Sequence, residues 1–176
     1  MKNQITFDLS SAILSLKKNQ VVTLPTETVE GYAVALSSSQ GIQSLMEIKS
    51  RGFDSDKIFT LVPESIEAIP KYVTLSDKTK NLIYQYFPGE LTIILPKNPL
   101  FRHFYYDHFQ TIGIRIPDHP IFPAIQDSVG AILLTSANPR GGTPKSITGH
   151  LPSTIIDCSI NPPKILRQGN LKIKTI

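Results

Sequence analysis

The sequence predicts a single-domain α/β sandwich built on a twisted, mostly mixed and open sheet. Short apolar runs rich in β-branched residues alternate along the chain with segments of helical periodicity. No repeat or low-complexity linker divides residues 1–176, and 176 residues are enough for one domain with a sizeable core. Two of the predicted strands lead into small polar residues, which places a candidate site at strand ends.

The predicted strands are apolar runs that stop at proline, glycine or a polar turn. The last two are expected to form a pair of edge strands joined through Asn161-Pro162-Pro163. The strands are predicted at Ile5–Leu9, Val21–Leu24, Tyr32–Leu36, Ile58–Val62, Leu91–Leu95, Thr111–Pro117, Ala131–Leu134, Ser153–Asp157 and Lys164–Gly169.

Capping residues and helix breakers predict the helices between these strands. Ser10 and Ser11 are expected to cap the first helix, which ends at Lys17-Lys18-Asn19, and the second ends near Lys49 and Arg51. The remaining helices are predicted at Glu64–Ile69, from Ser76-Asp77 to Tyr86, and at Ile121–Ser128.

Composition describes a globular protein with 40% hydrophobic residues. No apolar run approaches the ~20 residues that cross a bilayer, and the first residues lack a signal-peptide core, so a cytoplasmic location without membrane contact is expected. Residues 1–88 carry nine basic and nine acidic residues, whereas residues 89–176 carry nine basic and five acidic ones. This excess favours a polyanionic partner such as a nucleotide or RNA, or marks only a mildly basic surface.

Cys158 is the single cysteine, which excludes an intramolecular disulfide and a cysteine-rich metal cluster. Its apolar surroundings predict a buried structural thiol rather than a nucleophile.

Two clusters in the first third of the chain are candidates for chemistry. Thr26, Glu27 and Thr28 supply hydroxyls and a carboxylate directly after a predicted strand and Pro25. Lys49 and Arg51 are two closely spaced cations at a helix end, suited to a phosphate chain or, alternatively, only to the helix dipole and solvent.

The segment 101–109 interleaves aromatic residues with Arg102, His103 and His108. Such a loop could stack on nucleic-acid bases, could supply histidine and Asp107 as metal ligands, or could pack its rings against the domain. The histidine spacing does not match helical metal ligation, and no third ligand is evident.

Arg115 alternates with Thr111 and Gly113 on one face of a predicted strand, where a cation needs a partner. That partner is either an internal carboxylate, which makes a structural ion pair, or the carboxylate of a ligand. Farther along, Thr135, Ser136 and Asn138 leave a strand for a glycine- and proline-rich loop. They offer short donors and acceptors, or they form a cap or turn.

Seven motifs occur together in a fixed order. They are Pro-Thr-Glu-Thr-Val at 25–29, Lys-x-Arg at 49–51, Pro-Gly-x-Leu-Thr at 88–92, Gly-Ile-Arg-Ile-Pro at 113–117, Thr-Ser-Ala-Asn at 135–138, Ser-Thr-Ile-Ile-Asp at 153–157 and Leu-Arg-Gln-Gly at 166–169. In this order the chain resembles, over essentially its whole length, the YrdC-like family of threonylcarbamoyl-AMP synthases in their minimal single-domain form. The resemblance implies a YrdC-like α/β domain over 1–176 with a basic concave face.

The resemblance also implies a reaction: a nucleotidyltransferase that condenses L-threonine, bicarbonate and ATP to threonylcarbamoyl-AMP and pyrophosphate. Mg²⁺ is expected to accompany ATP, although no acidic pair suggests a dedicated metal site, and no tightly bound cofactor is expected. The product would pass to a threonylcarbamoyl-transferase complex that modifies tRNA. Direct binding of tRNA or double-stranded RNA is a further expectation.

Site residues carry over from the motifs by resemblance. Lys49 and Arg51 would be catalytic, holding ATP phosphates as a carbamate oxygen attacks the α-phosphorus. The residues implied for ATP binding are Lys49, Arg51, Thr111, Ser136, Asn138 and Arg167. Those implied for threonine binding are Thr26, Arg115 and Ser153, with Arg115 clamping the carboxylate. Because the substrate amine attacks carbon, no side-chain nucleophile is needed.

Three positions depart from the family pattern. Glu30 replaces an aromatic residue and would repel phosphates, Gly52 replaces a proline, and Arg140 replaces a serine. These departures keep open a paralogue that binds tRNA, double-stranded RNA or a nucleotide without synthase activity. A carbamoyl-transfer module like that of hydrogenase-maturation proteins is a weaker alternative, because those are large multidomain chains.

Overall fold

The computed structural model describes residues 7–52, 58–138, 142, 149 and 151–173. Within these ranges the strands are β1 (Val22–Leu24), β2 (Gly31–Ala35), β3 (Thr60–Val62), β4 (Leu91–Pro96), β5 (Thr111–Ile114), β6 (Ile132–Ser136), β7 (Thr154–Asp157) and β8 (Lys164–Arg167). The helices are α1 (Leu9–Lys17), α2 (Ser39–Ile48), α3 (Ile69–Tyr72), α4 (Asp77–Tyr86) and α5 (Phe122–Val129), with a short 3₁₀ helix η1 (Tyr106–His108).

The described strands form one open, mixed sheet in the order β1-β2-β6-β3-β5-β4-β7-β8. The pairs β3–β5 and β4–β7 are parallel, and the other neighbours are antiparallel. Strand β3 is antiparallel to β6 and parallel to β5, so it joins the two halves of the sheet. The predicted fold class, an α/β domain on an open mixed sheet, is confirmed.

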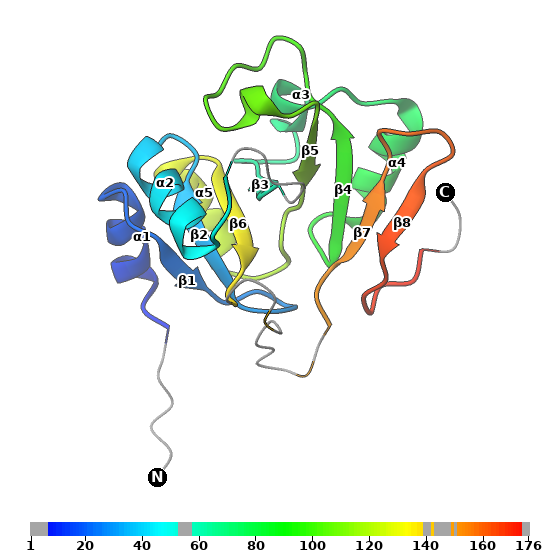
Figure 1. Ribbon diagram of the computed structural model, residues 1–176. Helices are drawn as coiled ribbons and strands as arrows, with labels where there is room; N and C mark the ends of the chain where they lie inside the picture. The colour runs from blue at the N-terminus through cyan, green and yellow to red at the C-terminus, as the bar shows by residue number, and fades with distance from the viewer. Residues whose placement is uncertain (1–6, 53–57, 139–141, 143–148, 150, 174–176) are drawn as a thin grey trace.

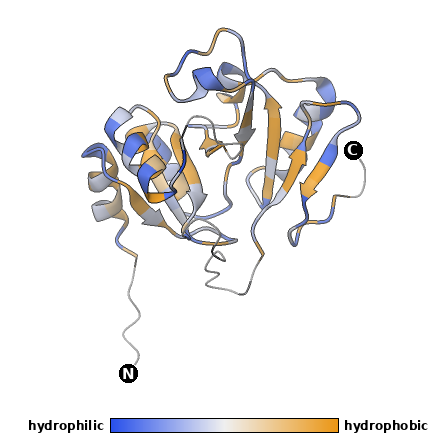
Figure 2. Cartoon of the chain, viewed as in Figure 1, coloured by the Kyte–Doolittle hydropathy of each residue, from blue (hydrophilic) through white to orange (hydrophobic). Residues whose placement is uncertain are grey.

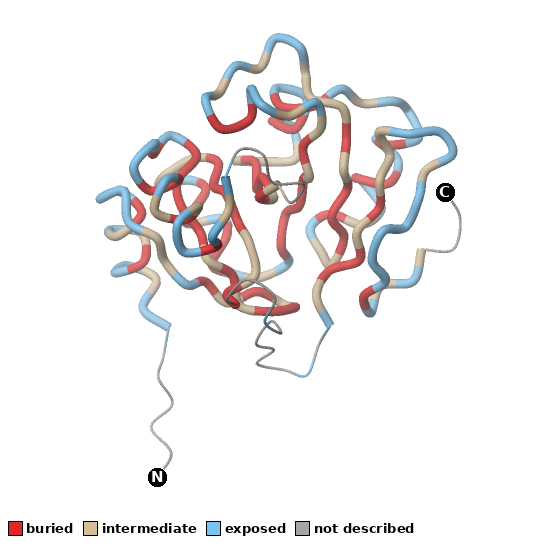
Figure 3. Tube along the Cα trace, in the orientation of Figure 1, coloured by how far each residue is buried: buried red, intermediate tan, exposed pale blue. Residues whose placement is uncertain are grey.

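Hydrophobic side chains alternate between the two faces of the sheet, as strand geometry requires. Neighbouring Ala33 and Val34 belong to different core clusters, and so do Leu61 and Val62. The smaller cluster joins the sheet to α1 and α5, and the larger one joins it to α2, α3 and α4. Figure 2 shows the central strands as mainly hydrophobic, and Figure 3 shows their residues as mostly buried, whereas β8 is exposed throughout. The molecule is thus a sandwich with helices on both faces.

The start of the chain differs from the prediction. Leu9 is the first residue of α1 rather than the end of a strand, and Ile5 lies outside the described residues. The cap is Asp8, whose carboxylate accepts hydrogen bonds from the Ser11 hydroxyl (2.6 Å) and the Ser11 N–H (3.1 Å). These bonds lower the pKa of Asp8. An aspartate one turn earlier therefore took the capping position that was assigned to Ser10 and Ser11.

The helix predicted at Glu64–Ile69 is wrong. The helix in this region is α3, and it begins at Ile69, with Pro70 in its first turn. Proline fits there because the first helical N–H groups have no intrahelical partner. Glu64 instead lies in the turn before α3 and accepts hydrogen bonds from Lys71 (2.7 Å) and the Tyr72 hydroxyl (2.5 Å).

The prediction of two edge strands is wrong for β7. It pairs with β4 on one side and β8 on the other, so β8 alone forms this edge of the sheet. Ile156 of β7 is fully buried in the larger core cluster, whereas Ile165 and Leu166 of β8 are exposed. The two strands have similar sequence patterns. Their burial differs because only β7 has a neighbouring strand on each side.

The aromatic segment 101–109 packs into the domain, which confirms one of its three interpretations. The Tyr105 ring stacks on Phe59 with 5.2 Å between centroids, and the hydroxyls of Tyr105 and Tyr106 bond the main-chain N–H and C=O of Phe59. Burial raises the pKa of Tyr105 to about 12. The His103 ring contacts the Leu36 carbonyl oxygen through Nε2 at 2.9 Å. Tyr105 and Tyr106 hold the residue before β3 in place, and because both are buried they are unavailable for stacking on bases.

Candidate functional site

The loop that follows β1 is fixed by its own hydroxyl groups. Thr26 Oγ1 accepts hydrogen bonds from the N–H groups of Thr28 (3.1 Å) and Val29 (3.2 Å) and donates one to the Val29 carbonyl oxygen (2.7 Å). Thr26 and Thr28 are buried, and their hydroxyl oxygens lie 3.0 Å apart. Side-chain bonds of this kind define a turn without help from neighbouring strands. We call residues 26–29 the threonine loop.

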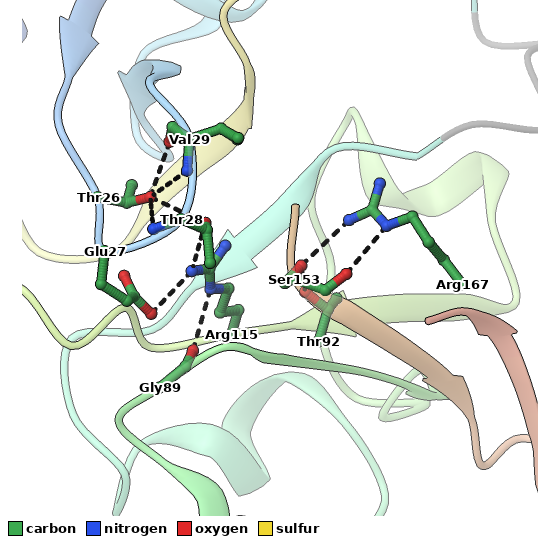
Figure 4. A network of polar contacts seen from close by, with 9 residues as sticks. All are labelled: Thr26, Glu27, Thr28, Val29, Gly89, Thr92, Arg115, Ser153 and Arg167. Atoms are coloured by element: carbon green, nitrogen blue, oxygen red, sulfur yellow. Dashed lines mark hydrogen bonds and ion pairs between the residues drawn. The ribbon is translucent and has the colours of Figure 1, made fainter. Parts of the chain in front are cut away.

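Arg115 follows β5 and lies beneath the threonine loop (Figure 4). Its side chain is only 7% exposed. Nη2 donates to Glu27 Oε1 at 2.8 Å and to Thr28 Oγ1 at 2.9 Å, and Nε donates to the Gly89 carbonyl oxygen at 3.1 Å. The internal carboxylate that the sequence left open as one alternative is therefore present, and it is Glu27.

Lys49 is the C-cap of α2 and is only 2% exposed. Its ammonium donates to the main-chain oxygens of Ser136 (2.9 Å), the last residue of β6, and Asn138 (2.5 Å), two residues later. The interpretation of Lys49 as a solvated helix end is therefore wrong. Instead, Lys49 holds the chain that leaves β6 against the end of α2.

The end of β6 is also joined to the loop after β1. The Ala137 N–H donates to the Glu30 carbonyl oxygen at 2.8 Å, and Asn138 Nδ2 donates to the Gly142 carbonyl oxygen at 2.7 Å. Lys49, Ser136, Asn138 and the threonine loop thus belong to one hydrogen-bonded region. The turn interpretation of Ser-Ala-Asn holds for the main chain, since the Asn138 N–H also donates to the Ser136 carbonyl oxygen at 2.9 Å.

A second cluster surrounds Arg167 at the end of β8 (Figure 4). Its Nε donates to the Ser153 carbonyl oxygen at 2.9 Å, and its Nη2 donates to Ser153 Oγ at 3.2 Å. Ser153 Oγ in turn lies 2.9 Å from Thr92 Oγ1 on β4. Burial lowers the pKa of Arg167, and so does the positive charge of Arg115.

Two predicted residues lie apart from these clusters. Arg51 is half-buried, and its guanidinium carbon lies 5.3 Å from the centroid of the Phe59 ring. Thr111 begins β5 and pairs with Pro96, at the end of the strand opposite to Arg115. At 3.3 Å per residue, the two ends are separated by about 13 Å. The structure therefore gathers seven predicted residues into adjacent clusters: Thr26, Lys49, Arg115, Ser136, Asn138, Ser153 and Arg167.

The sequence reasoning missed the partners of the arginines. Glu27 was noted only as a carboxylate near the strand end, and Thr28, Gly89 and Thr92 received no role. The need of Arg115 for a carboxylate was the available signal, but the sequence could not choose among the acidic residues. Gly89 has a packing reason as well: a Cβ there would lie 2.7 Å from the Tyr86 carbonyl oxygen.

The described residues do not offer a resident metal site. No group of three or more histidine, cysteine, aspartate or glutamate side chains lies together in the ranges that the structure covers. Glu27, the carboxylate of the cluster, is already bound to Arg115. The donors present are mainly cations and hydroxyls, which suit anions rather than a divalent ion. In the same ranges, no helix combines the length and the apolar character needed to cross a membrane.

A pocket of about 370 Å³ lies outside this region, between α4 and the turn from β7 to β8. Leu82, Cys158 and Ile160 are among its lining residues, and none of the predicted site residues is. Burial raises the pKa of Cys158 to about 11, with a smaller contribution from Asp157. The raised pKa argues against a nucleophile, but Cys158 is only half-buried, so the prediction of a buried thiol is not confirmed.

Residues 15–148 match the family model of Sua5, YciO and YrdC, which is described as telomere recombination. The chain belongs to this Sua5/YciO/YrdC family. The match covers most of the chain and confirms the resemblance recognised from the seven ordered motifs.

Two curated relatives are named threonylcarbamoyl-AMP synthase. The chain is similar to threonylcarbamoyl-AMP synthase of Yersinia enterocolitica, with 27% identity over 147 residues that cover 81% of this chain and 76% of the relative. It is also similar to threonylcarbamoyl-AMP synthase of Bacillus subtilis, with 28% identity over 93% of this chain and 54% of the relative. The names of these relatives agree with the expectation of an enzyme of the nucleotidyltransferase type.

Solved structures show the same fold. A variant of P. abyssi Sua5 superimposes with a TM-score of 0.81 at 23% identity, and P. abyssi Sua5 complexed with L-threonine superimposes with a TM-score of 0.77 at 24% identity. Both comparisons cover 93% of this chain and 54% of the other, so the chain spans about half the length of Sua5. E. coli YciO superimposes with a TM-score of 0.75 at 19% identity, over 94% of this chain and 91% of the other.

Proposed function

We propose that the chain is a threonylcarbamoyl-AMP synthase, which condenses L-threonine, bicarbonate and ATP to threonylcarbamoyl-AMP and pyrophosphate. The observation that carries the proposal is the presence of Arg115 and Arg167 in one polar region, beside the hydroxyls of Thr28 and Ser153 (Figure 4). Two cations in one region favour an anion between them. The names of the curated relatives and the threonine complex of Sua5 support the identity of the substrates.

In this proposal Arg115 binds the threonine carboxylate, and Ser153 lies beside it. Thr26 acts by shaping the threonine loop, because its hydroxyl already bonds three main-chain groups of that loop. The threonine amine attacks the carbon of bicarbonate, and water is lost to give a carbamate. Binding both reactants side by side turns this step into an effectively intramolecular one.

The carbamate oxygen then attacks the α-phosphorus of ATP, and pyrophosphate leaves. Arg167, Lys49 and Arg51 supply positive charge where negative charge develops on the leaving phosphates. Lys49 also fixes the main chain of Ser136 and Asn138, and those two residues with Thr111 complete the proposed nucleotide contacts. Mg²⁺ enters as the partner of the ATP phosphates rather than as a resident ion.

The proposed product is an activated intermediate for a threonylcarbamoyl-transferase complex that modifies tRNA, which would place the chain in the cytoplasm. A second candidate, a nucleotide- or RNA-binding paralogue without synthase activity, rests on Glu30. This residue puts a carboxylate where the resemblance expects an aromatic ring, and its main chain joins the end of β6.

Product formation tests the proposal. Purified protein is incubated with ATP, Mg²⁺, bicarbonate and radiolabelled threonine, and the products are separated by chromatography. A labelled adenylate that requires all three substrates, with pyrophosphate in equal amount, is the expected result. If folded protein binds ATP or RNA but forms no adenylate, the paralogue is the correct interpretation.

A further inference from the structure

We propose that Glu27 is the positioning residue for Arg115: it fixes the guanidinium so that Nη1 alone faces the ligand carboxylate. The identity of that ligand as threonine rests on the proposed function. The positioning itself rests on the contacts around Arg115.

The guanidinium of Arg115 is held along one side. Nε donates to the Gly89 carbonyl oxygen, and the two N–H groups of Nη2 donate to Glu27 Oε1 and Thr28 Oγ1. Nη1 makes no hydrogen bond with any residue in the described ranges. It is also not closed off from solvent. An arginine has five N–H donors, so two remain, and both are on Nη1. A carboxylate can therefore reach Arg115 without displacing Glu27.

Glu27 acts through Arg115 rather than on the ligand. Its Oε1 receives Nη2 at 2.8 Å, and its Oε2 is buried from solvent. The Glu27 side chain as a whole is 17% exposed. Glu27 is therefore poorly suited as a base for the substrate amine, because Oε1 is bonded to Arg115 and Oε2 is out of reach from solvent.

The threonine loop makes Glu27 a fixed anchor. Thr26 bonds the main chain on both sides of Thr28, and Thr28 itself bonds Arg115. The backbone position of Glu27 is thereby set by bonds that do not involve its own side chain. An orienting group on a rigid loop keeps its partner in one rotamer before the ligand arrives, and less conformational entropy is then lost on binding.

The charge of Glu27 has a second effect. The positive charge of Arg115 contributes to lowering the pKa of Arg167, and the Glu27 carboxylate is paired with that charge. Without the carboxylate, Arg115 would lose both the bond that fixes its plane and the charge that holds it beneath the loop. We therefore expect loss of Glu27 to disturb the use of the carboxylate substrate much more than the use of ATP.

Two variants separate geometry from charge. Glu27→Ala removes the acceptor and the charge, whereas Glu27→Gln keeps an oxygen for Nη2 and removes only the charge. With Glu27→Ala we expect the KM and the Kd for threonine to rise about tenfold or more, and the KM for ATP to change less than about threefold. With Glu27→Gln we expect the KM for threonine to stay within about threefold of the wild-type value. An unchanged threonine KM in Glu27→Ala would overturn the proposal, and so would equal losses in both variants.

A measurement on the free protein keeps this test apart from the proposed reaction. In ¹⁵N-detected NMR, the Arg115 Nη1 and Nη2 signals of the wild type should be distinct, because the hydrogen bonds of Nη2 hinder rotation about the Nε–Cζ bond. In Glu27→Ala they should merge, and in Glu27→Gln they should stay distinct. Merged signals in the wild type would overturn the proposal even if the enzyme makes threonylcarbamoyl-AMP. Distinct signals that merge on loss of Glu27 would support the proposal even if the enzyme does not make threonylcarbamoyl-AMP.

The matched control is Glu64→Gln. Glu64 is also a partly buried carboxylate, bonded to Lys71 and Tyr72, but it lies outside the site. The Glu64→Gln variant should be less stable than the wild type, with an unchanged KM for threonine and unchanged Arg115 signals. If Glu27→Ala does not fold, Glu27→Gln and the wild-type spectrum still decide between the outcomes.

Discussion

The two arginine clusters differ in how firmly each cation is held. Arg115 is buried under the threonine loop and bonds a carboxylate, a hydroxyl and a carbonyl oxygen. Arg167 lies on the exposed edge strand β8, and among the described residues its hydrogen bonds go to one residue, Ser153. The first cation is therefore prepared for one ligand position, whereas the second can adjust by moving a single strand. This contrast suits a site in which a small amino acid is held in one pose and a longer phosphate chain is accommodated.

The largest expected effect comes from the firmly held cation. Arg115→Ala should reduce kcat/KM for threonine by about a hundredfold and lower the free energy of unfolding by about 3 kcal/mol, because Glu27 is left without its charge partner. Steady-state kinetics and urea unfolding measure the two effects. If ATP use falls as much as threonine use, the assignment of Arg115 to the carboxylate is wrong.

The second-largest effect is expected for the Lys49→Met variant. The variant keeps the length of the side chain but leaves the Ser136 and Asn138 carbonyl oxygens without their donor, so we expect a loss of about 2 kcal/mol in stability. The Kd for ATP, measured by calorimetry, should rise about tenfold, while the Kd for threonine should change little. An ATP affinity equal to that of the wild type would leave Lys49 with a purely structural role.

Arg167→Ala should affect function with little cost in stability, since the residue lies on the exposed edge strand. We expect kcat/KM for ATP to fall about tenfold and the free energy of unfolding to change by less than about 1 kcal/mol. A large loss of stability, seen as a shift of the urea midpoint, would contradict the contrast between the two clusters.

The smallest effect concerns Cys158, close to the turn between β7 and β8. Because burial raises its pKa to about 11, the thiolate is scarce at pH 8 and should react slowly with a disulfide reagent, with a rate that increases towards pH 11. A raised folded-state pKa means that the folded protein binds the proton more tightly, so this contribution to stability is present below the unfolded pKa and is lost as pH rises through about 11. Rapid labelling at pH 8 would contradict the raised pKa of Cys158.

Much of this arrangement could be predicted from the sequence because short-range patterns decide it. The alternation of apolar residues located most strands, and Ser76 and Gly130 were correctly placed at the ends of α4 and α5. The errors arose where two local signals competed. Asp8 replaced the neighbouring serines as a cap, and Pro70 began a helix instead of ending one.

The partners within the site could not be predicted in the same way. The pairing of Arg115 with Glu27 joins residues far apart in sequence, and it depends on the tertiary fold that brings the loop after β1 to the end of β5. The burial of Lys49 likewise depends on where β6 ends relative to α2. Sequence spacing suggested which side chains carry charge, but not which oxygen each of them meets.

One bond in the site involves no side chain. The Ala137 N–H meets the carbonyl oxygen of Glu30, so any residue with an ordinary backbone at position 30 keeps the two loops joined. The side chain at this position can then change in size and charge while the hydrogen bond between the two loops stays intact. Position 30 is thus a place where the surroundings of the substrates can be retuned during evolution without rebuilding the framework that holds them.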